Sequence, residues 1–174
     1  MDEKQKLLRH FLAALAYRTQ KALRDAPAEF GTFRIADAVR TPTELVRHMT
    51  SVLGYARTFF VGGKYRAEPL PLLKDEVSRF HEMLEDIARH IEIGAPMLEE
   101  ISAEQLLQGP FSDAMTHAGQ LALLRRLAGN PVAPENFVFA GINAERLGIE
   151  QAEPLRPDEE WDEAPEGWLP PSRR

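Results

Sequence analysis

Four long stretches of the chain carry apolar residues at alternating spacings of three and four, and glycine or proline follows each stretch. This spacing is the period of an amphipathic α-helix. Helices are therefore expected at about residues 2–25, 42–62, 73–93 and 110–129. Because each helix has one apolar face to bury, the pattern predicts an all-α fold, a four-helix bundle with a long crossover between its second and third helices.

Local signals at helix ends support these boundaries. Residues 41–44 read Thr-Pro-Thr-Glu, which combines a threonine cap, a proline in the first turn and a capping-box glutamate. Residues 102–105 show a second capping-box pattern, so a short helix is expected there, stopped by Gly-Pro at 109–110. Further along, residues 143–147 are expected to form one or two helical turns.

The composition limits the kinds of site that the chain can build. With 174 residues, 44% of them apolar, residues 1–150 are expected to form one domain around one core. The chain has no cysteine, which excludes disulfides and thiolate ligands, so any metal must bind nitrogen and oxygen atoms. No apolar run approaches the roughly 18 residues of a membrane span. We therefore expect no membrane association and a cytoplasmic location.

The negative charge is concentrated at the C-terminal end. Residues 150–174 hold eight acidic and three basic residues, a net of −5 out of −6, which leaves −1 for residues 1–149. No basic stripe is visible, so nucleic acid is not an expected partner. The acidic, proline-containing tail at 151–174 is expected to pack irregularly on the body or on a neighbouring molecule through Trp161 and Trp168. A homodimer is compatible with this expectation.

Three polar residues fall on the apolar faces. Asp113 and His117 lie four residues apart on the fourth helix, with Cβ atoms about 6 Å apart, on a side that continues as apolar residues. His48 belongs to the apolar stripe of the second helix. By contrast, His81 and His90 lie one residue off the seam of the third helix and are expected at its flank or in solvent.

A carboxylate and two imidazoles that point into a bundle are costly to bury unless something binds them. Two histidines and one aspartate, with the remaining coordination positions left to water, are a ligand set typical of a reactive metal site. His48, Asp113 and His117 are therefore candidate metal ligands.

A second interpretation fits the same spacing. His48 would be a hydrogen-bonded core histidine, Asp113 would be favoured in the first turn by the helix dipole, and His117 would be its partner on the helix surface. A D-x-x-x-H pair alone is a weak motif, so the spacing of the pair does not decide between the two interpretations.

Two parts of the chain share a further pattern. One is His48-Met49, and the other runs from Asp113-Ala-Met-Thr-His117 through Ala-Gly-Gln120 to Gly129-Asn-Pro131. Together they resemble the two signature helices of the DinB/YfiT-like superfamily. The resemblance in helix spacing covers about residues 1–135. It implies a four-helix bundle and a divalent metal, typically zinc or nickel, bound by His48, Asp113 and His117. Many relatives carry histidine at the position of Asp113, and a carboxylate there shifts the metal preference toward harder ions.

Two neighbours of His117 are interpreted separately. Gln120, one turn further along, is expected to support a ligand or to pack beside it. Gly119 is expected to allow a close approach between helices.

Two functional hypotheses follow from these residues. The first is a metal-dependent enzyme acting on a small-molecule substrate, either a hydrolase or a transferase of a low-molecular-weight thiol, in which a water or thiol on the metal is the nucleophile. The alternative is a non-catalytic, stress-associated bundle that serves as a binding or dimerisation module, with the three polar residues as a buried hydrogen-bonded cluster.

Overall fold

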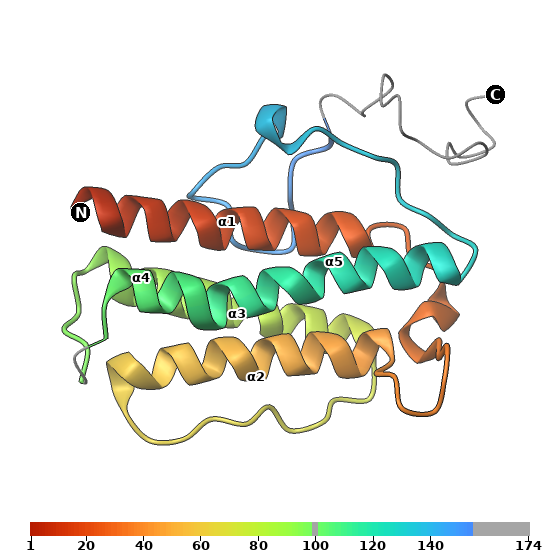
Figure 1. The fold of residues 1–174 in the computed structure, drawn as a ribbon, viewed down its shortest axis with the longest axis horizontal. Helices are drawn as coiled ribbons and strands as arrows, with labels where there is room; N and C mark the ends of the chain where they lie inside the picture. Colours follow the sequence, from red (N-terminus) through yellow and green to blue (C-terminus); the bar gives the residue numbers. More distant parts are fainter. Residues whose placement is uncertain (99–100, 155–174) are drawn as a thin grey trace.

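The computed structural model describes residues 1–98 and 101–154 (Figure 1). Four long helices pack side by side as a bundle, α1 (Glu3–Leu23), α2 (Pro42–Val61), α3 (Leu73–Glu92) and α5 (Ser112–Leu127). Four short elements join or follow them: η1 (Ala28–Thr32), α4 (Ala103–Leu106), the π-turn η2 (Leu107–Phe111) and η3 (Phe137–Phe139). The described residues include no β-strand element. The predicted all-α four-helix bundle is confirmed.

The apolar faces expected from the sequence form the core. The seam of α3 is buried along its length, at Val77, Phe80, Leu84, Ile87 and Ile91. It packs against α2, while α1 and α5 pack against each other and close the bundle. The bundle therefore has a single continuous core.

The predicted start of α2 is confirmed in detail. The hydroxyl of Thr41 accepts a hydrogen bond from the backbone N–H of Glu44 at 3.2 Å, and the Glu44 carboxylate accepts one from the backbone N–H of Thr41 at 2.8 Å. This reciprocal cap satisfies two backbone donors that a helix end otherwise leaves free. It fixes where α2 begins, and hence where His48 lies on its second turn.

The Gly-Pro pair at 109–110 bends the chain without separating two helices. α4 runs through η2 into α5, and only Gly109 has a non-helical backbone, with φ −93° and ψ −108°. The hydroxyl of Ser112 donates to the carbonyl of Leu107 at 2.6 Å, which takes up one carbonyl freed by the kink. Asp113 consequently lies in the first turn of α5.

The chain after α5 returns along α1 (Figure 1). Residues 143–147, expected to form one or two helical turns, form a single hydrogen-bonded turn and no helix. Asn143 forms one turn only, its side chain accepting from the N–H of Glu145 and its carbonyl from the N–H of Arg146, both at 2.9 Å. Arg24, the C-cap residue of α1, donates to the carbonyls of residues 151 and 152. The predicted tail anchors at Trp161 and Trp168 lie outside the described residues, and the homodimer stays a prediction.

The expectation that His81 lies at a flank or in solvent is wrong. His81 is only 2% exposed, and its Nδ1 lies 2.7 Å from the carbonyl oxygen of Leu147, to which it donates. Burial lowers the pKa of His81, and the hydrogen bond to Leu147 opposes this effect. The segment that covers His81 is distant in the chain, so the helical periodicity around His81 could not predict that this side chain is buried. His90 is half-buried and stacks on Phe60.

Protonation of His81 is expected to make stability depend on pH. Because the folded pKa lies below the ordinary 6.5, the unfolded chain binds the proton first as the pH falls. Stability is therefore fully present above about pH 6.5 and declines below it, by up to about 1.4 kcal/mol per pH unit for each such histidine. Urea denaturation from pH 8 to 5.5 should show this slope, and His81→Gln should flatten it. An unchanged slope in the variant would contradict the assignment.

Glycine has a packing role in α2 that it lacks in α5. A Cβ on Gly54 would lie 1.9 Å from the ring of Tyr65, which belongs to the crossover after α2. A Cβ on Gly119 would meet no atom within 4 Å, so the expected close helix approach at Gly119 is wrong. Gly54→Ala should thus destabilise the fold by about 1–3 kcal/mol. Its control, Gly119→Ala, should gain about 0.5–1 kcal/mol from helix propensity. Chemical denaturation of both variants measures the contrast, and equal effects would contradict it.

Candidate metal centre

Three side chains meet where α2 and α5 pack together. His48 comes from the second turn of α2, and Asp113 and His117 come from the first two turns of α5. One nitrogen of each imidazole and one carboxylate oxygen all lie within 4.8 Å of one another. The fold therefore brings together the three residues that the sequence predicted as a group.

Their separations suit a common ion. The Nε2 atom of His117 lies 3.4 Å from Oδ1 of Asp113. Two ligands at about 2.1 Å from a tetrahedral ion are themselves about 3.4 Å apart. The rings of His48 and His117 have centroids 4.7 Å apart and planes at 73°. The His48 ring thus lies beside the pair formed by His117 and Asp113, with one ligand atom of each residue within 4.8 Å of the others.

The three side chains form a gradient from interior to solvent. His117 is buried at 8% exposure, His48 is half-buried, and the side chain of Asp113 is 53% exposed. The expectation that Asp113 points into the interior is wrong, because the buried face of α5 runs through Ala114, Ala118 and Leu121, and Asp113 lies beside that face. The centre is closed on the His117 side and open on the Asp113 side.

Gln120 fixes the orientation of His117. Its side-chain oxygen lies 2.9 Å from Nδ1 of His117 and accepts the proton of that nitrogen. Nε2 then keeps its lone pair, and this is the atom that faces Asp113. This arrangement, a ligating histidine held from behind by a polar partner, is common around bound metals.

The surroundings of His48 keep its ring neutral. Burial lowers the pKa of His48, the nearby charge of Arg40 lowers it further, as does His117 whenever that ring is protonated, and Asp113 opposes them. No hydrogen bond joins either ring nitrogen to another residue in the described part of the chain. At neutral pH the His48 ring therefore offers a lone pair without displacing a proton.

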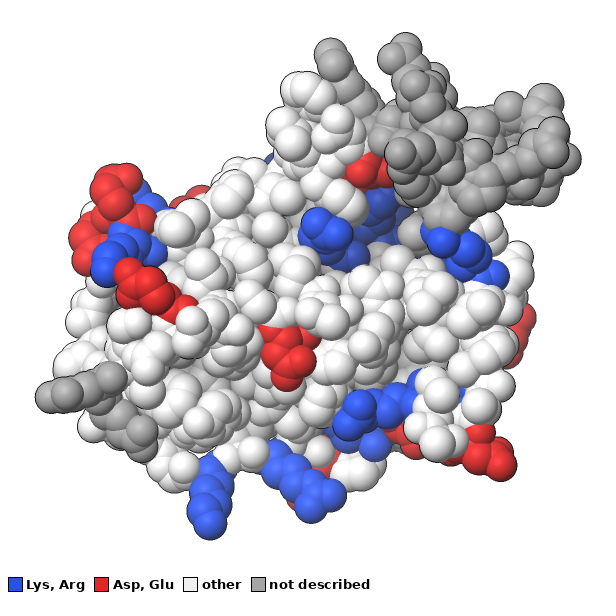
Figure 2. All heavy atoms as spheres, viewed as in Figure 1, with Lys and Arg blue, Asp and Glu red and all other residues white. Residues whose placement is uncertain are grey.

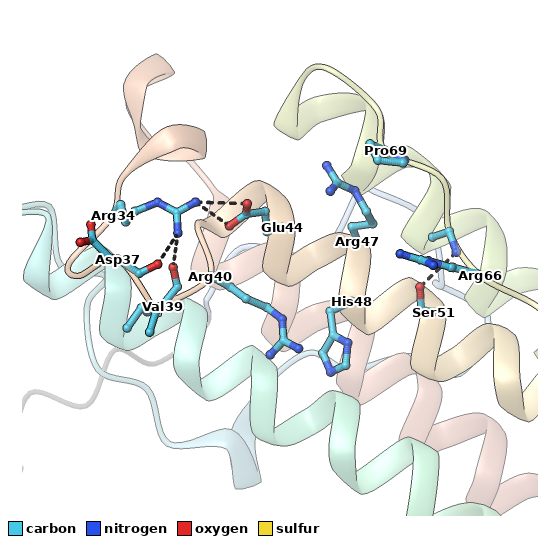
Figure 3. Close-up of a pocket in the computed structure, with 12 residues that line it drawn as sticks. Arg34, Asp37, Val39, Arg40, Glu44, Arg47, His48, Ser51, Arg66 and Pro69 are labelled. Carbon is cyan, nitrogen blue, oxygen red and sulfur yellow. Dashed lines mark hydrogen bonds and ion pairs between the residues drawn. The ribbon is translucent and has the colours of Figure 1, made fainter.

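Two cavities meet at His48 and Ser51, which line both of them. One has a volume of about 710 Å³ and is also bordered by Tyr55, Pro110 and Asp113. The other has a volume of about 400 Å³ and carries four arginines, Arg34, Arg40, Arg47 and Arg66 (Figure 3). Sequence reasoning missed these arginines because they come from three separate segments, each of which reads as an ordinary solvated surface.

The chain was compared with family models, with curated proteins and with solved structures, and none of the three comparisons finds a match. Among the helices of residues 1–98 and 101–154, none is long and apolar enough to cross a membrane. The centre must therefore be interpreted from its own geometry.

Proposed function

We propose that the chain is a metal-dependent enzyme in which His48, Asp113 and His117 hold one divalent ion, zinc or nickel, beside a small-molecule pocket. The observation that carries the proposal is the open side of the three-residue group, where the 710 Å³ cavity reaches both His48 and Asp113. A structural metal site would be closed by a fourth protein ligand.

The donor set fits such an ion. Two neutral imidazoles and one carboxylate carry a net charge of −1, which partly balances a divalent cation, and no sulfur ligand is needed. A bound ion of this kind lowers the pKa of a coordinated water or thiol and polarises a carbonyl. Hydrolysis, or transfer involving a low-molecular-weight thiol, is the reaction class that this chemistry supports.

The protein's own residues supply orientation and access. Gln120 holds the ring of His117 so that Nε2 faces Asp113, and burial keeps that ring in place. Tyr55 and Pro110 form apolar walls of the cavity, against which a substrate can pack. The same arrangement of ligands on the second and last bundle helices is implied by the DinB/YfiT-like resemblance, and we include membership of that superfamily in the proposal.

The alternative, a non-catalytic bundle with a buried polar cluster, has weaker support. A stabilising buried cluster requires each polar atom to be hydrogen-bonded and shielded from water. Asp113 is more than half exposed, and within the described residues no hydrogen bond is found for the His48 ring. These features favour a ligand-binding site.

Cobalt substitution tests the proposal, because the spectrum of Co²⁺ reports its coordination directly. Untagged, metal-free protein is titrated with Co²⁺, and a simple thiol such as 2-mercaptoethanol is then added. We expect visible bands that saturate at one equivalent and a new thiolate charge-transfer band after the thiol enters an open position. A saturated spectrum that does not respond to thiol or to azide would refute an open, reactive centre.

Removal of the partner of His117 should weaken the centre without destroying it. In Gln120→Ala the Nδ1 proton of His117 loses its acceptor, so the ring is free to change orientation and tautomer. Loss of such a partner typically costs 10–100-fold in metal affinity, so a decrease of about that size is expected. Competition with a chromophoric zinc chelator measures the change. Gln151→Ala, a glutamine outside the site, is the control and should bind zinc like the wild type.

A further inference from the structure

The 400 Å³ cavity next to His48 has an uneven set of charges. Its lining includes four arginines and two carboxylates, Asp37 and Glu44, which leaves a net charge of +2 with His48 neutral. Residues 1–149 together carry −1. Figure 2 shows basic side chains gathered along the edge of the molecule formed by α2 and the crossover that follows it. The cavity is therefore a local concentration of positive charge on a nearly neutral body.

Two of the four arginines are engaged in the structure. Arg34 donates to both carboxylate oxygens of Glu44, at 3.1 and 3.0 Å, and Arg47 donates to Glu76 at 2.7 Å. Arg34 also donates to the carbonyls of Asp37 and Val39 (Figure 3). The hydrogen bonds of these two arginines therefore join the segments of the chain that line the cavity.

The other two, Arg40 and Arg66, have no such partner. No ion pair or hydrogen bond involves either guanidinium among residues 1–98 and 101–154. Arg40 immediately precedes α2 and Arg66 belongs to the crossover, and in Figure 3 both side chains extend toward the part of the cavity occupied by His48 and Ser51. Two guanidinium groups that face one cavity repel each other unless an anion lies between them.

The backbone that carries each free arginine is fixed beforehand. The contacts of Arg34 brace residues 37–39, just before Arg40. On the other side, the N–H of Ala67 donates to the Ser51 hydroxyl at 3.1 Å, directly after Arg66. A site whose cations are held in place loses little conformational entropy when a ligand binds.

We propose that Arg40 and Arg66 bind the anionic group of the substrate, a carboxylate or a phosphate, and so direct the rest of that molecule across His48 to the metal centre. Guanidinium groups match both anions through paired N–H donors. The second half of this proposal rests on the proposed function, whereas anion binding itself does not. The substrate class is thus a small molecule with an acidic group at one end and its reactive group at the other.

The anion site is tested on metal-free, untagged protein at constant ionic strength. Inorganic phosphate and succinate are titrated separately by calorimetry, and the two probes distinguish a phosphate from a carboxylate preference. We compare wild type with Arg40→Gln and Arg66→Gln. The control is Arg146→Gln, which removes the same charge from an exposed arginine that lies outside the cavity.

We expect saturable binding of at least one probe, weakened at least about tenfold by either cavity variant and unchanged by Arg146→Gln, since each variant removes a charge-assisted contact. If neither probe binds saturably, or if all three variants weaken binding equally, the anion site is refuted.

In the same proteins, Arg40→Gln should raise zinc affinity, because it removes a positive charge near His48. If the wild-type protein binds the anion but no zinc, the metal centre is refuted and the anion site is not. Failure of the proposed function and failure of the anion site are therefore distinguishable.

Discussion

Replacing His117 with alanine is expected to abolish zinc binding, with a decrease in affinity well beyond the roughly 10–100-fold that loss of a supporting partner causes. His117 is the most deeply buried of the three candidate ligands, and its Nε2 lies 3.4 Å from the Asp113 carboxylate. The substitution also leaves Gln120 without its partner. Chelator-buffered zinc titrations of wild type and His117→Ala measure the difference.

A matched control separates this effect from a general loss of histidine. His10 is exposed on α1 and takes no part in the three-residue group, so His10→Ala should bind zinc like the wild type. Far-ultraviolet circular dichroism and melting of the metal-free proteins check that each variant is folded. Equal zinc affinities in folded His117→Ala and wild type would remove His117 from the centre.

Glu76→Ala is expected to cause the largest loss of stability. The carboxylate of Glu76 is fully buried and accepts hydrogen bonds from Arg47 at 2.7 Å, from the backbone N–H of Leu70 at 2.9 Å, and from Arg79. Breaking a buried ion pair by removing one partner typically costs about 3–5 kcal/mol. The two arginines are partly exposed and can turn to water, so a loss of about 3 kcal/mol is expected.

The loss should also loosen the crossover, because Glu76 ties Leu70 to the start of α3. Glu82→Ala is the control, since Glu82 lies exposed on the same helix and has no ion pair in the described part of the chain. Urea denaturation should show a change within about 0.5 kcal/mol for the control. A similarly small change for Glu76→Ala would mean that the buried network contributes little.

The bundle could be predicted from the sequence because its determinants are local. The apolar spacing, the capping box at Thr41 and the glycine after each of α2, α3 and α5 act within a few residues of one another, and all are present in the structure. The same spacing placed Asp113 and His117 on one side of α5 and His48 on the facing side of α2. Their approach within 4.8 Å follows from packing these two helices together.

Features that depend on distant segments could not be predicted in this way. His81 is buried because the chain near Leu147 crosses it, and a lone histidine beside a helical seam carries no sign of such a cover. Asp113 is exposed because the packing of α5 buries Ala114 and Ala118 and leaves Asp113 beside the buried face, and the contact face of a helix depends on the helices around it. The positive cavity combines residues from the loop before α2, from α2 itself and from the crossover, and only the folded chain shows which arginines remain free.

X-ray absorption of untagged protein loaded with one equivalent of zinc reports directly whether His48, Asp113 and His117 bind a metal ion. We expect a site with two imidazoles and one carboxylate at about 2.0–2.2 Å from the ion, completed by water. In His48→Ala and His117→Ala this signature should disappear while the fold is retained. A wild-type protein that binds no stoichiometric zinc or nickel, or a spectrum that keeps both imidazoles in these variants, would contradict a metal centre at His48, Asp113 and His117.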